Sequence, residues 1–304
     1  MSRRSSNPLA KLSWLSVVIV FAGFIYREWQ QQQKPEPRTK TQRSRSNGSR
    51  TSREPATPSR SNSRDSNEGN LLLGNPSNAG RSEDNYLLER PQYSLSYSRS
   101  RGGPNWVAWH TDAQDLGVVE RGKFRPDPDL PSSWAVTPND YKGSGFDRGH
   151  VCPSGDRTRA RADNDATFYM SNMLPQTAEL NQHVWADFEN EVRNIVRQGN
   201  EVYQIAGGIG ENGTIANGKV TVPQVCWKVV VVLPEGNNDL SRINAKTRVL
   251  SLGIPNVKDS RLETGDWRSY LRSLDKIEST TKLNLLSALP AKVRSALGKQ
   301  IDSG

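Results

Sequence analysis

The sequence predicts an α+β domain in which helices flank a largely antiparallel β-sheet. Short apolar or alternating runs of strand length precede and follow one stretch that has the apolar spacing of a helix. Clusters of glycine and proline separate these runs. Strands before a central helix and strands after it imply an α+β domain around a largely antiparallel sheet.

Five segments are expected to form strands. Residues 93–97 and 106–110 alternate apolar and polar side chains, which predicts strands with one buried face. Residues 203–206, 225–233 and 247–254 are more continuously apolar, which predicts central strands.

Two segments are expected to form helices. The first ends near Gly199, and its apolar residues recur at helical spacing: Val184, Trp185, Phe188, Val192, Ile195 and Val196. The second is predicted over residues 266–286. Its apolar stripe is Trp267, Tyr270, Leu271 and Leu274.

The domain is expected to span residues 70–304, after a targeting segment at 1–29. Basic residues flank an uncharged stretch at 12–26, which has the length of a secretory apolar core. Because no Ala-x-Ala-like cleavage site follows, the first interpretation is an uncleaved signal anchor; a cleaved signal peptide is the alternative. Both place the domain outside the cytoplasm, either anchored to the membrane or secreted to the periplasm or medium.

A linker is predicted over residues 30–69. It is rich in Gln, Ser, Arg, Pro and Asn and has almost no aliphatic residue, so it cannot bury enough apolar surface to offset its chain entropy and should be disordered. Residues 1–68 carry 13 Lys and Arg against 5 Asp and Glu, whereas the rest of the chain carries 28 against 27. The positive charge therefore lies mostly outside the domain, and an argument for nucleic-acid binding must rest on individual arginines.

Cys152 and Cys226 leave two alternatives open. An even number of cysteines in an exported chain permits a disulfide. Their apolar neighbours are equally typical of two separate buried thiols. The chain has three histidines and no Cys-x-x-Cys pair, which argues against a structural zinc site.

His150 is the first candidate catalytic residue. It ends a glycine-rich run that closes with Asp147-Arg148-Gly149-His150, where glycine lets the backbone turn tightly and an anionic ligand approach closely. A neutral imidazole can take a proton from water near neutral pH. Asp147 is expected to pair with a neighbour and to shape the turn.

Asn181 and Glu189 are candidates for a metal site. Asn181 opens the predicted helix, where an asparagine serves either as a helix cap or as an amide-oxygen ligand of a hard cation such as Mg²⁺. Glu189 lies about 80° around and roughly 12 Å along an ideal helix from Asn181. Because helical side chains lean toward the N-terminus, its carboxylate can reach water molecules on an ion held there.

Three arginines are candidates for phosphate contacts. Arg148 precedes His150 in the turn, Arg193 lies one turn beyond Glu189, and Arg125 lies in a predicted loop before the histidine. A guanidinium matches two phosphate oxygens and stabilises the negative charge that develops in a phosphoryl transition state.

Other polar residues are not expected to carry chemistry. His110 ends a predicted strand and is given no role. The carboxylate pairs Asp112 with Asp115 and Asp127 with Asp129 have the proximity that a two-metal site needs, but without adjacent histidines they are expected on loop surfaces.

At these residues the chain resembles the DNA/RNA non-specific endonuclease family of ββα-metal (His-Me finger) nucleases. The resemblance spans roughly residues 70–285. It lies in the segments 73–79, 105–109, 124–127, 141–150 and 171–176, and in Leu180-Asn-Gln followed by Trp185 and Glu189. Within the family the chain is most similar to the secreted, sugar-non-specific nucleases of bacteria.

The resemblance implies the fold and the reaction. It implies a ββα-metal nuclease domain that hydrolyses the phosphodiester bonds of single- and double-stranded DNA and RNA and leaves 5′-phosphate ends. His150 would be the general base. Asn181 would be the one direct protein ligand of a hydrated Mg²⁺, which Mn²⁺ can replace, and Glu189 would bind its water molecules.

The resemblance also implies supporting roles. Arg125 would stabilise the pentacovalent phosphorane, Arg148 and Arg193 would hold phosphate, and Asn172 would help to support the site.

Two other classes of function are alternatives to a nuclease. A membrane-tethered nucleic-acid receptor without turnover would be expected to have a damaged site, and the histidine, asparagine, glutamate and arginines are all present. A phosphodiesterase that acts on lipids or nucleotides would fail to digest long plasmid DNA. An inhibitor protein that guards the producing cell is a partner for which the sequence offers no signal.

Overall fold

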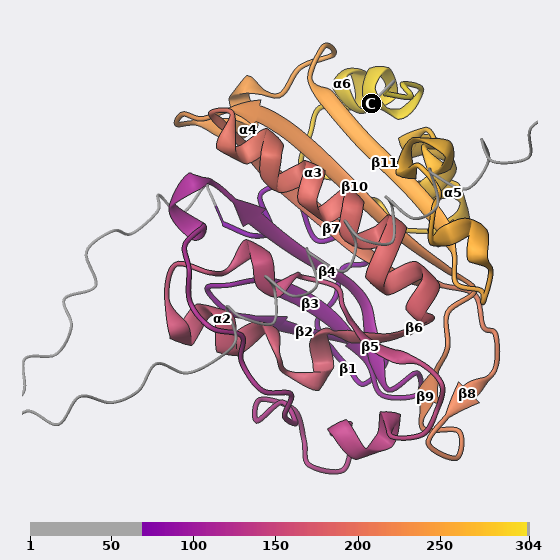
Figure 1. Ribbon diagram of the computed structural model, residues 1–304. Helices are drawn as coiled ribbons and strands as arrows, with labels where there is room; N and C mark the ends of the chain where they lie inside the picture. The colour runs from indigo at the N-terminus through magenta and orange to yellow at the C-terminus, as the bar shows by residue number, and fades with distance from the viewer. Residues whose placement is uncertain (1–68, 303–304) are drawn as a thin grey trace, which may run out of the picture. The chain divides into compact units, whose positions relative to one another are not determined.

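A seven-stranded antiparallel sheet with helices on both faces forms the centre of the structure, a computed structural model that describes residues 69–302 (Figure 1). The predicted targeting segment, and all but the last residue of the predicted linker, lie outside these residues. Within residues 69–302, no helix combines the length and apolar character needed to cross a membrane.

The first four strands of the chain are neighbours in the sheet, and three later strands follow them in sequence order. Each adjacent pair of strands is antiparallel. In spatial order the strands are β1 (Arg81–Ser82), β2 (Asn85–Glu89), β3 (Ser94–Ser98), β4 (Gly103–Thr111), β7 (Asn200–Ile209), β10 (Val225–Pro234) and β11 (Arg248–Pro255). The α+β class, the antiparallel sheet and the five predicted strands are therefore confirmed.

Both faces of the sheet are buried, which explains the continuous apolar runs of its central strands. Along β10, alternate side chains point to opposite faces. Trp227, Val229 and Val231 pack with α5 (Leu274–Thr281) and α6 (Ala291–Gly298). Val230 and Val232 pack with the apolar stripe of α3 (Trp185–Arg197). The first predicted helix is therefore confirmed, and Gly199 follows it with a φ of +88°.

The segment between β4 and β7 carries most of the pocket described below. It contains α2 (Arg161–Thr167), α3, and the antiparallel pair β5 (Asp147–His150) and β6 (Met173–Gln176), in which His150 lies opposite Met173. β5, β6 and α3 together make a ββα unit packed on one face of the sheet. Later in the chain come the hairpin β8 (Thr214–Ile215) and β9 (Val220–Thr221) and the short α4 (Asp239–Arg242).

The second predicted helix, residues 266–286, is wrong as a single element. A 3₁₀ turn, Trp267–Tyr270, precedes α5, and the two are separated at Leu271, which forms a β-bridge with Leu252 of β11. The supposed apolar stripe serves both faces of the sheet, because Trp267 and Leu271 pack on the α3 side while Leu274 packs on the other. A chain that passes around the edge of a sheet cannot do so as one straight helix.

The two cysteines are separate buried thiols. The Cys226 Sγ accepts a hydrogen bond from the Gln176 amide at 3.4 Å, which places it against β6 and not against Cys152. The structure thus decides between the two alternatives that the sequence left open.

Candidate active site

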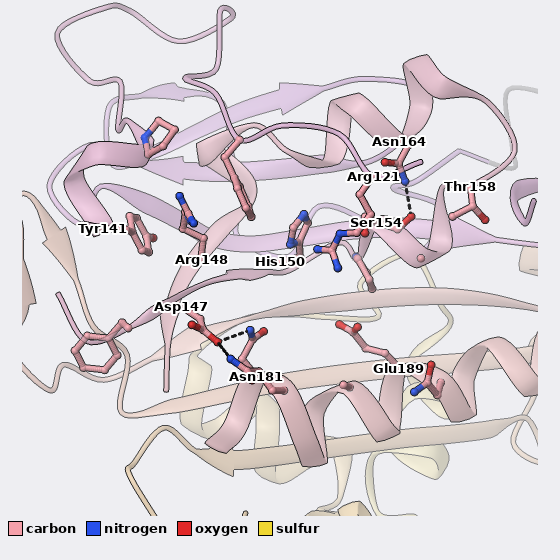
Figure 2. A pocket seen from close by; sticks show the side chains of 18 of the residues that line it. Arg121, Tyr141, Asp147, Arg148, His150, Ser154, Thr158, Asn164, Asn181 and Glu189 are labelled. Carbon is pink, nitrogen blue, oxygen red and sulfur yellow. Dashed lines mark hydrogen bonds between the residues drawn. The ribbon is translucent and has the colours of Figure 1, made fainter. Parts of the chain in front are cut away.

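A pocket of about 860 Å³ lies between the β5 region and α3. Figure 2 shows His150 on one side of this pocket, with the side chains of Asn181 and Glu189 pointing toward it from the opposite side. Six of the predicted site residues line it: Asp147, Arg148, His150, Asn181, Glu189 and Arg193. Arg125 and Asn172 are not among the lining residues.

His150 is enclosed by aromatic rings at the end of β5. Its ring centroid lies 4.7 Å from that of Phe168 and 5.4 Å from that of Phe124. Burial, together with the nearby positive charge of Arg121, lowers the pKa of His150 to about 3. Its Nε2 has no hydrogen-bond partner among residues 69–302. The imidazole is therefore neutral at neutral pH, with a ring nitrogen that the described protein groups leave unused.

Asp147 fixes the orientation of the Asn181 amide. Its Oδ2 accepts hydrogen bonds from Asn181 Nδ2 at 2.9 Å and from Gln182 Nε2 at 2.8 Å. Since the amide nitrogen of Asn181 is directed to Asp147, its oxygen is the atom left to act as a ligand. The predicted pairing of Asp147 with neighbours is thus seen, and it joins the histidine strand to the asparagine.

Asn181 does not open a helix as predicted. It lies within a π-helical turn, Leu180–Val184, that continues into α3, and its backbone N–H donates to the Thr177 carbonyl at 2.9 Å. The wider turn changes the angle between Asn181 and Glu189 from that of an ideal helix. Such π-turns often occur at functional sites.

Glu189 has one face toward the pocket and the other toward the interior. Its Oε1 lies 3.5 Å from the Lys228 Nζ, and its side chain is 13% exposed. Burial raises the pKa of Glu189 above its usual range, and the charges of Lys228 and Arg193 offset only part of this effect.

Arg193 is held in place by buried Asp156. Its Nη1 lies 2.9 Å from Asp156 Oδ1, and its Nη2 donates to Asn190. Asp156 also accepts hydrogen bonds from Trp109 and Gln204 of the sheet, each at 3.0 Å. Although burial acts in the opposite direction, the charges of Arg193 and Lys228 lower the pKa of Asp156, which therefore stays ionised.

Asn172 braces the chain that follows His150. This fully buried residue accepts a hydrogen bond from Cys152 N and donates to the carbonyls of Cys152 and Thr167, all at 2.9 Å. Its own carbonyl accepts from Val151 N at 3.0 Å. Through these contacts Asn172 ties the chain after His150 to the end of α2.

The arginines lie at different places relative to the pocket. Arg148 stacks on Phe124 with its Cζ 4.4 Å from the ring centroid, at the edge of the pocket. Arg125 stacks on Tyr169 at the same distance. Arg121, which the sequence analysis did not select, lines the pocket with His150. It is an exposed arginine in a loop, and nothing in its local sequence distinguishes it.

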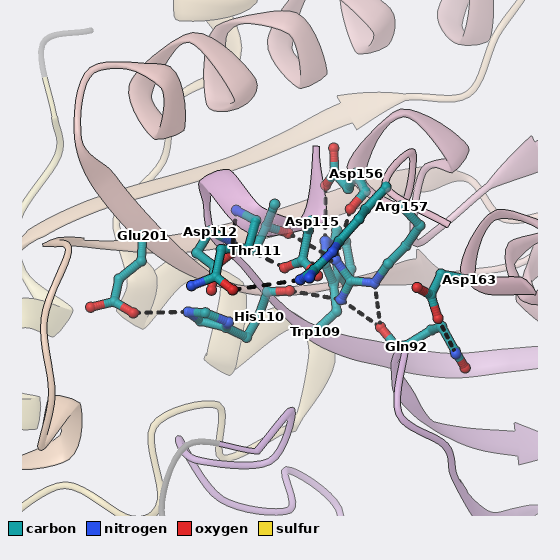
Figure 3. A network of polar contacts seen from close by, with 12 residues as sticks. Gln92, Trp109, His110, Thr111, Asp112, Asp115, Asp156, Arg157, Asp163 and Glu201 are labelled. Atoms are coloured by element: carbon teal, nitrogen blue, oxygen red, sulfur yellow. Dashed lines mark hydrogen bonds and ion pairs between the residues drawn. The ribbon is translucent and has the colours of Figure 1, made fainter. Parts of the chain in front are cut away.

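A second cluster of polar residues surrounds His110 (Figure 3). His110 Nε2 lies 3.0 Å from Glu201 Oε2, and ligand-type atoms of Asp112 and Asp115 also lie within 4.8 Å of the ring. Arg242 forms ion pairs with Glu201 and Asp239 on the other side. None of these residues lines the pocket of His150.

The second carboxylate pair differs in part from the prediction. Asp129 is exposed, as expected for a loop surface, whereas Asp127 is buried and its Oδ2 lies 3.0 Å from Arg90 Nη2. Asp127 is therefore part of a structural ion pair.

Comparison with known proteins identifies the family of the chain. The family model described as DNA/RNA non-specific endonuclease matches residues 75–292. The chain belongs to the DNA/RNA non-specific endonuclease family. Membership makes the protein a hydrolase that cleaves phosphodiester bonds in nucleic acid.

Several relatives support the assignment. The chain is 46% identical over 238 residues to a nuclease of Nostoc sp. The match covers 77% of this chain and 86% of the relative. It is 33% identical over 254 residues to Nuclease C1 of Cunninghamella echinulata var. echinulata, covering 75% and 96%. A crystal structure of the EndoG/EndoGI complex contains a chain with the same fold, with a TM-score of 0.61, 23% identity, and coverage of 74% of this chain and 92% of that one.

Proposed function

We propose that this endonuclease cleaves single- and double-stranded DNA and RNA without sequence or sugar preference, with His150 as general base and a hydrated Mg²⁺ at Asn181. The observation that supports this proposal is that His150, Asn181 and Glu189, from β5 and from the helix after β6, line one pocket. Cleavage of the P–O3′ bond would leave 5′-phosphate ends.

The imidazole of His150 has the state that a base requires. It is neutral at neutral pH because of its burial and the charge of Arg121. Because Nε2 is buried, Nδ1 would be the ring nitrogen that accepts the proton of a water molecule as that water attacks phosphorus. The flanking Phe124 and Phe168 hold the ring in position.

The oxygen atoms on the α3 side fit a hard divalent ion. Magnesium prefers oxygen ligands and keeps several water molecules, so one amide oxygen from Asn181 and a carboxylate from Glu189 that binds those waters suffice. A bound ion would polarise a non-bridging phosphate oxygen and assist the departure of the leaving oxygen. The same ligands accept Mn²⁺.

The charges around the pocket suit a phosphate backbone. Arg121, Lys142, Arg148 and Arg193 line it, so cations outnumber carboxylates. We assign phosphate binding to Arg148 and Arg193. Arg121 is better placed than Arg125 to stabilise charge on phosphorus, since it shares the pocket with His150. Contacts with phosphate and not with base edges would give the enzyme no preference for the nucleotide sequence of its substrate.

Residues 1–29 would direct the enzyme out of the cytoplasm, with residues 12–26 either retained as a membrane anchor or removed. Mass spectrometry of the N-terminus of the mature protein distinguishes these forms, and an unprocessed protein found in the cytoplasm would contradict both.

Cleavage of supercoiled plasmid and of RNA by the full-length protein tests the proposal, with Mg²⁺, with Mn²⁺ and with EDTA. His150→Ala should lower the rate by about 10²- to 10⁴-fold, as expected for a lost general base. Asn181→Ala should shift the Mg²⁺ titration to higher concentration. Asp187→Asn, which alters an exposed carboxylate of α3, is the matched control.

Three results would contradict the proposal. Full activity of His150→Ala would show that His150 is not the general base. An unchanged Mg²⁺ titration of Asn181→Ala would show that Asn181 is not the metal ligand. Products that a kinase labels at their 5′ ends without prior phosphatase treatment would show the opposite bond cleavage.

A further inference from the structure

Lys228 is a buried cation behind the pocket. It lies on β10 with no exposed side-chain surface, and its Nζ has no hydrogen-bond partner among residues 69–302. The Nζ lies between two indole rings, 5.1 Å from the centroid of Trp109 and 4.8 Å from that of Trp185. A charge removed from water is unfavourable unless something compensates it, so the position calls for an explanation.

The compensation comes chiefly from Glu189. Its Oε1 is 3.5 Å from the Nζ, and no other carboxylate of the described chain lies within ion-pair distance of Lys228. The indole faces attract a cation but offer it no hydrogen-bond acceptor. The cation is therefore held by groups that do not compete with Glu189.

Three charged groups face Glu189 from the elements packed around it. Lys228 faces it from β10, Arg193 from α3, and Asp156 from the turn after β5. Arg193 is already bound to Asp156 at 2.9 Å and to Asn190 at 2.8 Å. Lys228 is thus the cation whose nearest carboxylate is Glu189.

We propose that Lys228 is a positioning residue, whose buried ammonium group 3.5 Å from Oε1 holds the Glu189 carboxylate in place so that its other oxygen points into the pocket. The inference rests on the proposed role of Glu189. The contact is made by the buried Oε1, so Lys228 supplies charge on the interior side and leaves Oε2 able to accept hydrogen bonds from water in the pocket. Lys228 itself does not line the pocket and would not touch the substrate.

The test compares full-length Lys228→Met, which keeps an unbranched side chain as far as Cε and removes the charged nitrogen, with wild type. Mn²⁺ binding without DNA is measured by electron paramagnetic resonance, and plasmid cleavage is measured across pH. Mn²⁺ affinity should fall by about 10-fold, the lower end of the loss expected when a partner of a metal ligand is removed, because Glu189 binds the ion's water molecules and not the ion itself. The acidic limb of the rate profile should move to higher pH, because an uncompensated Glu189 binds a proton more readily.

Two further variants separate this role from a structural one. Val230→Ala is the control, because Val230 is buried two residues along β10 in the cluster under α3 and carries no charge. In a Glu189→Gln background, Lys228→Met should leave Mn²⁺ affinity unchanged. This double variant also removes both buried charges, so it remains informative if the single variant does not fold.

The outcomes distinguish the inference from the function on which it rests. Wild-type cleavage and Mn²⁺ binding by Glu189→Gln would contradict the role of Glu189. Impairment of Glu189→Gln together with a Lys228→Met variant that behaves like Val230→Ala would overturn the positioning role alone. An effect of Lys228→Met that persists undiminished in the Glu189→Gln background would also overturn it.

Discussion

Replacing Asn172 by alanine should destabilise the whole domain, because the side chain satisfies three buried backbone groups. Asn172→Ala leaves the N–H and carbonyl of Cys152 and the carbonyl of Thr167 without the partners they have at 2.9 Å. An unsatisfied buried polar group costs about 1–3 kcal/mol, and with partial relief by water we expect a loss of about 3–6 kcal/mol. That is a large share of the roughly 5–15 kcal/mol of a typical domain.

Urea unfolding in EDTA, followed by tryptophan fluorescence, measures this loss as a lower midpoint. Asn194→Ala, which alters an exposed asparagine of α3, is the control and should change the free energy of unfolding by less than about 0.5 kcal/mol. A loss below about 1 kcal/mol for Asn172→Ala would refute the reasoning. Cleavage measured well below the unfolding midpoint should also be slower, because Asn172 holds the strand that ends at His150.

Other predictions concern the pocket and the thiols. Arg121→Ala should lower kcat more than Arg125→Ala, since Arg121 lines the pocket; the reverse order in cleavage assays would support the sequence-based choice. Because the pKa of His150 is near 3 and the unfolded chain binds a proton near pH 6.5, stability should be lost as pH falls between these values. Relative to His150→Gln, wild type should lose up to about 2 kcal/mol from pH 7 to pH 5 in EDTA, and a pH-independent difference in urea unfolding would contradict this. Burial raises the pKa of Cys226 to about 12 and that of Cys152 further, so a thiol reagent should label neither in the native protein and both after denaturation.

Five of the seven strands of the sheet could be predicted from the sequence, because each buries one or both faces and so has an alternating or a continuously apolar run of residues. The strands β1 and β2 could not, because only one of their residues is buried. Residues 266–286 could not be predicted in the same way. Their apolar spacing fits a helix, but the side chains at Leu271 and Leu274 pack on opposite faces of the sheet. The spacing of apolar residues indicates which side chains are buried. It does not indicate the element or the face of the sheet against which they pack.

The residues that meet in the pocket could be selected from the sequence because His150, Asn181 and Glu189 stand in a motif shared with a known family. Lys228 and Arg121 have no such local signal. A lysine within a run of valines has no visible partner until α3 places Glu189 over it. Arg121 lies in an exposed loop, and only the fold shows that this loop places it in the same pocket as His150.

The pocket-bearing segment leaves the sheet at Thr111 and returns at a neighbouring strand, where Thr111 pairs with Val202. The two residues are about 90 positions apart, and joining such distant partners is a slow step in folding because a long loop must close first. The pairing of β4 with β7 therefore cannot form until the segment between these two strands has closed into a loop. Activity should accordingly emerge late in folding, together with the last of the native structure.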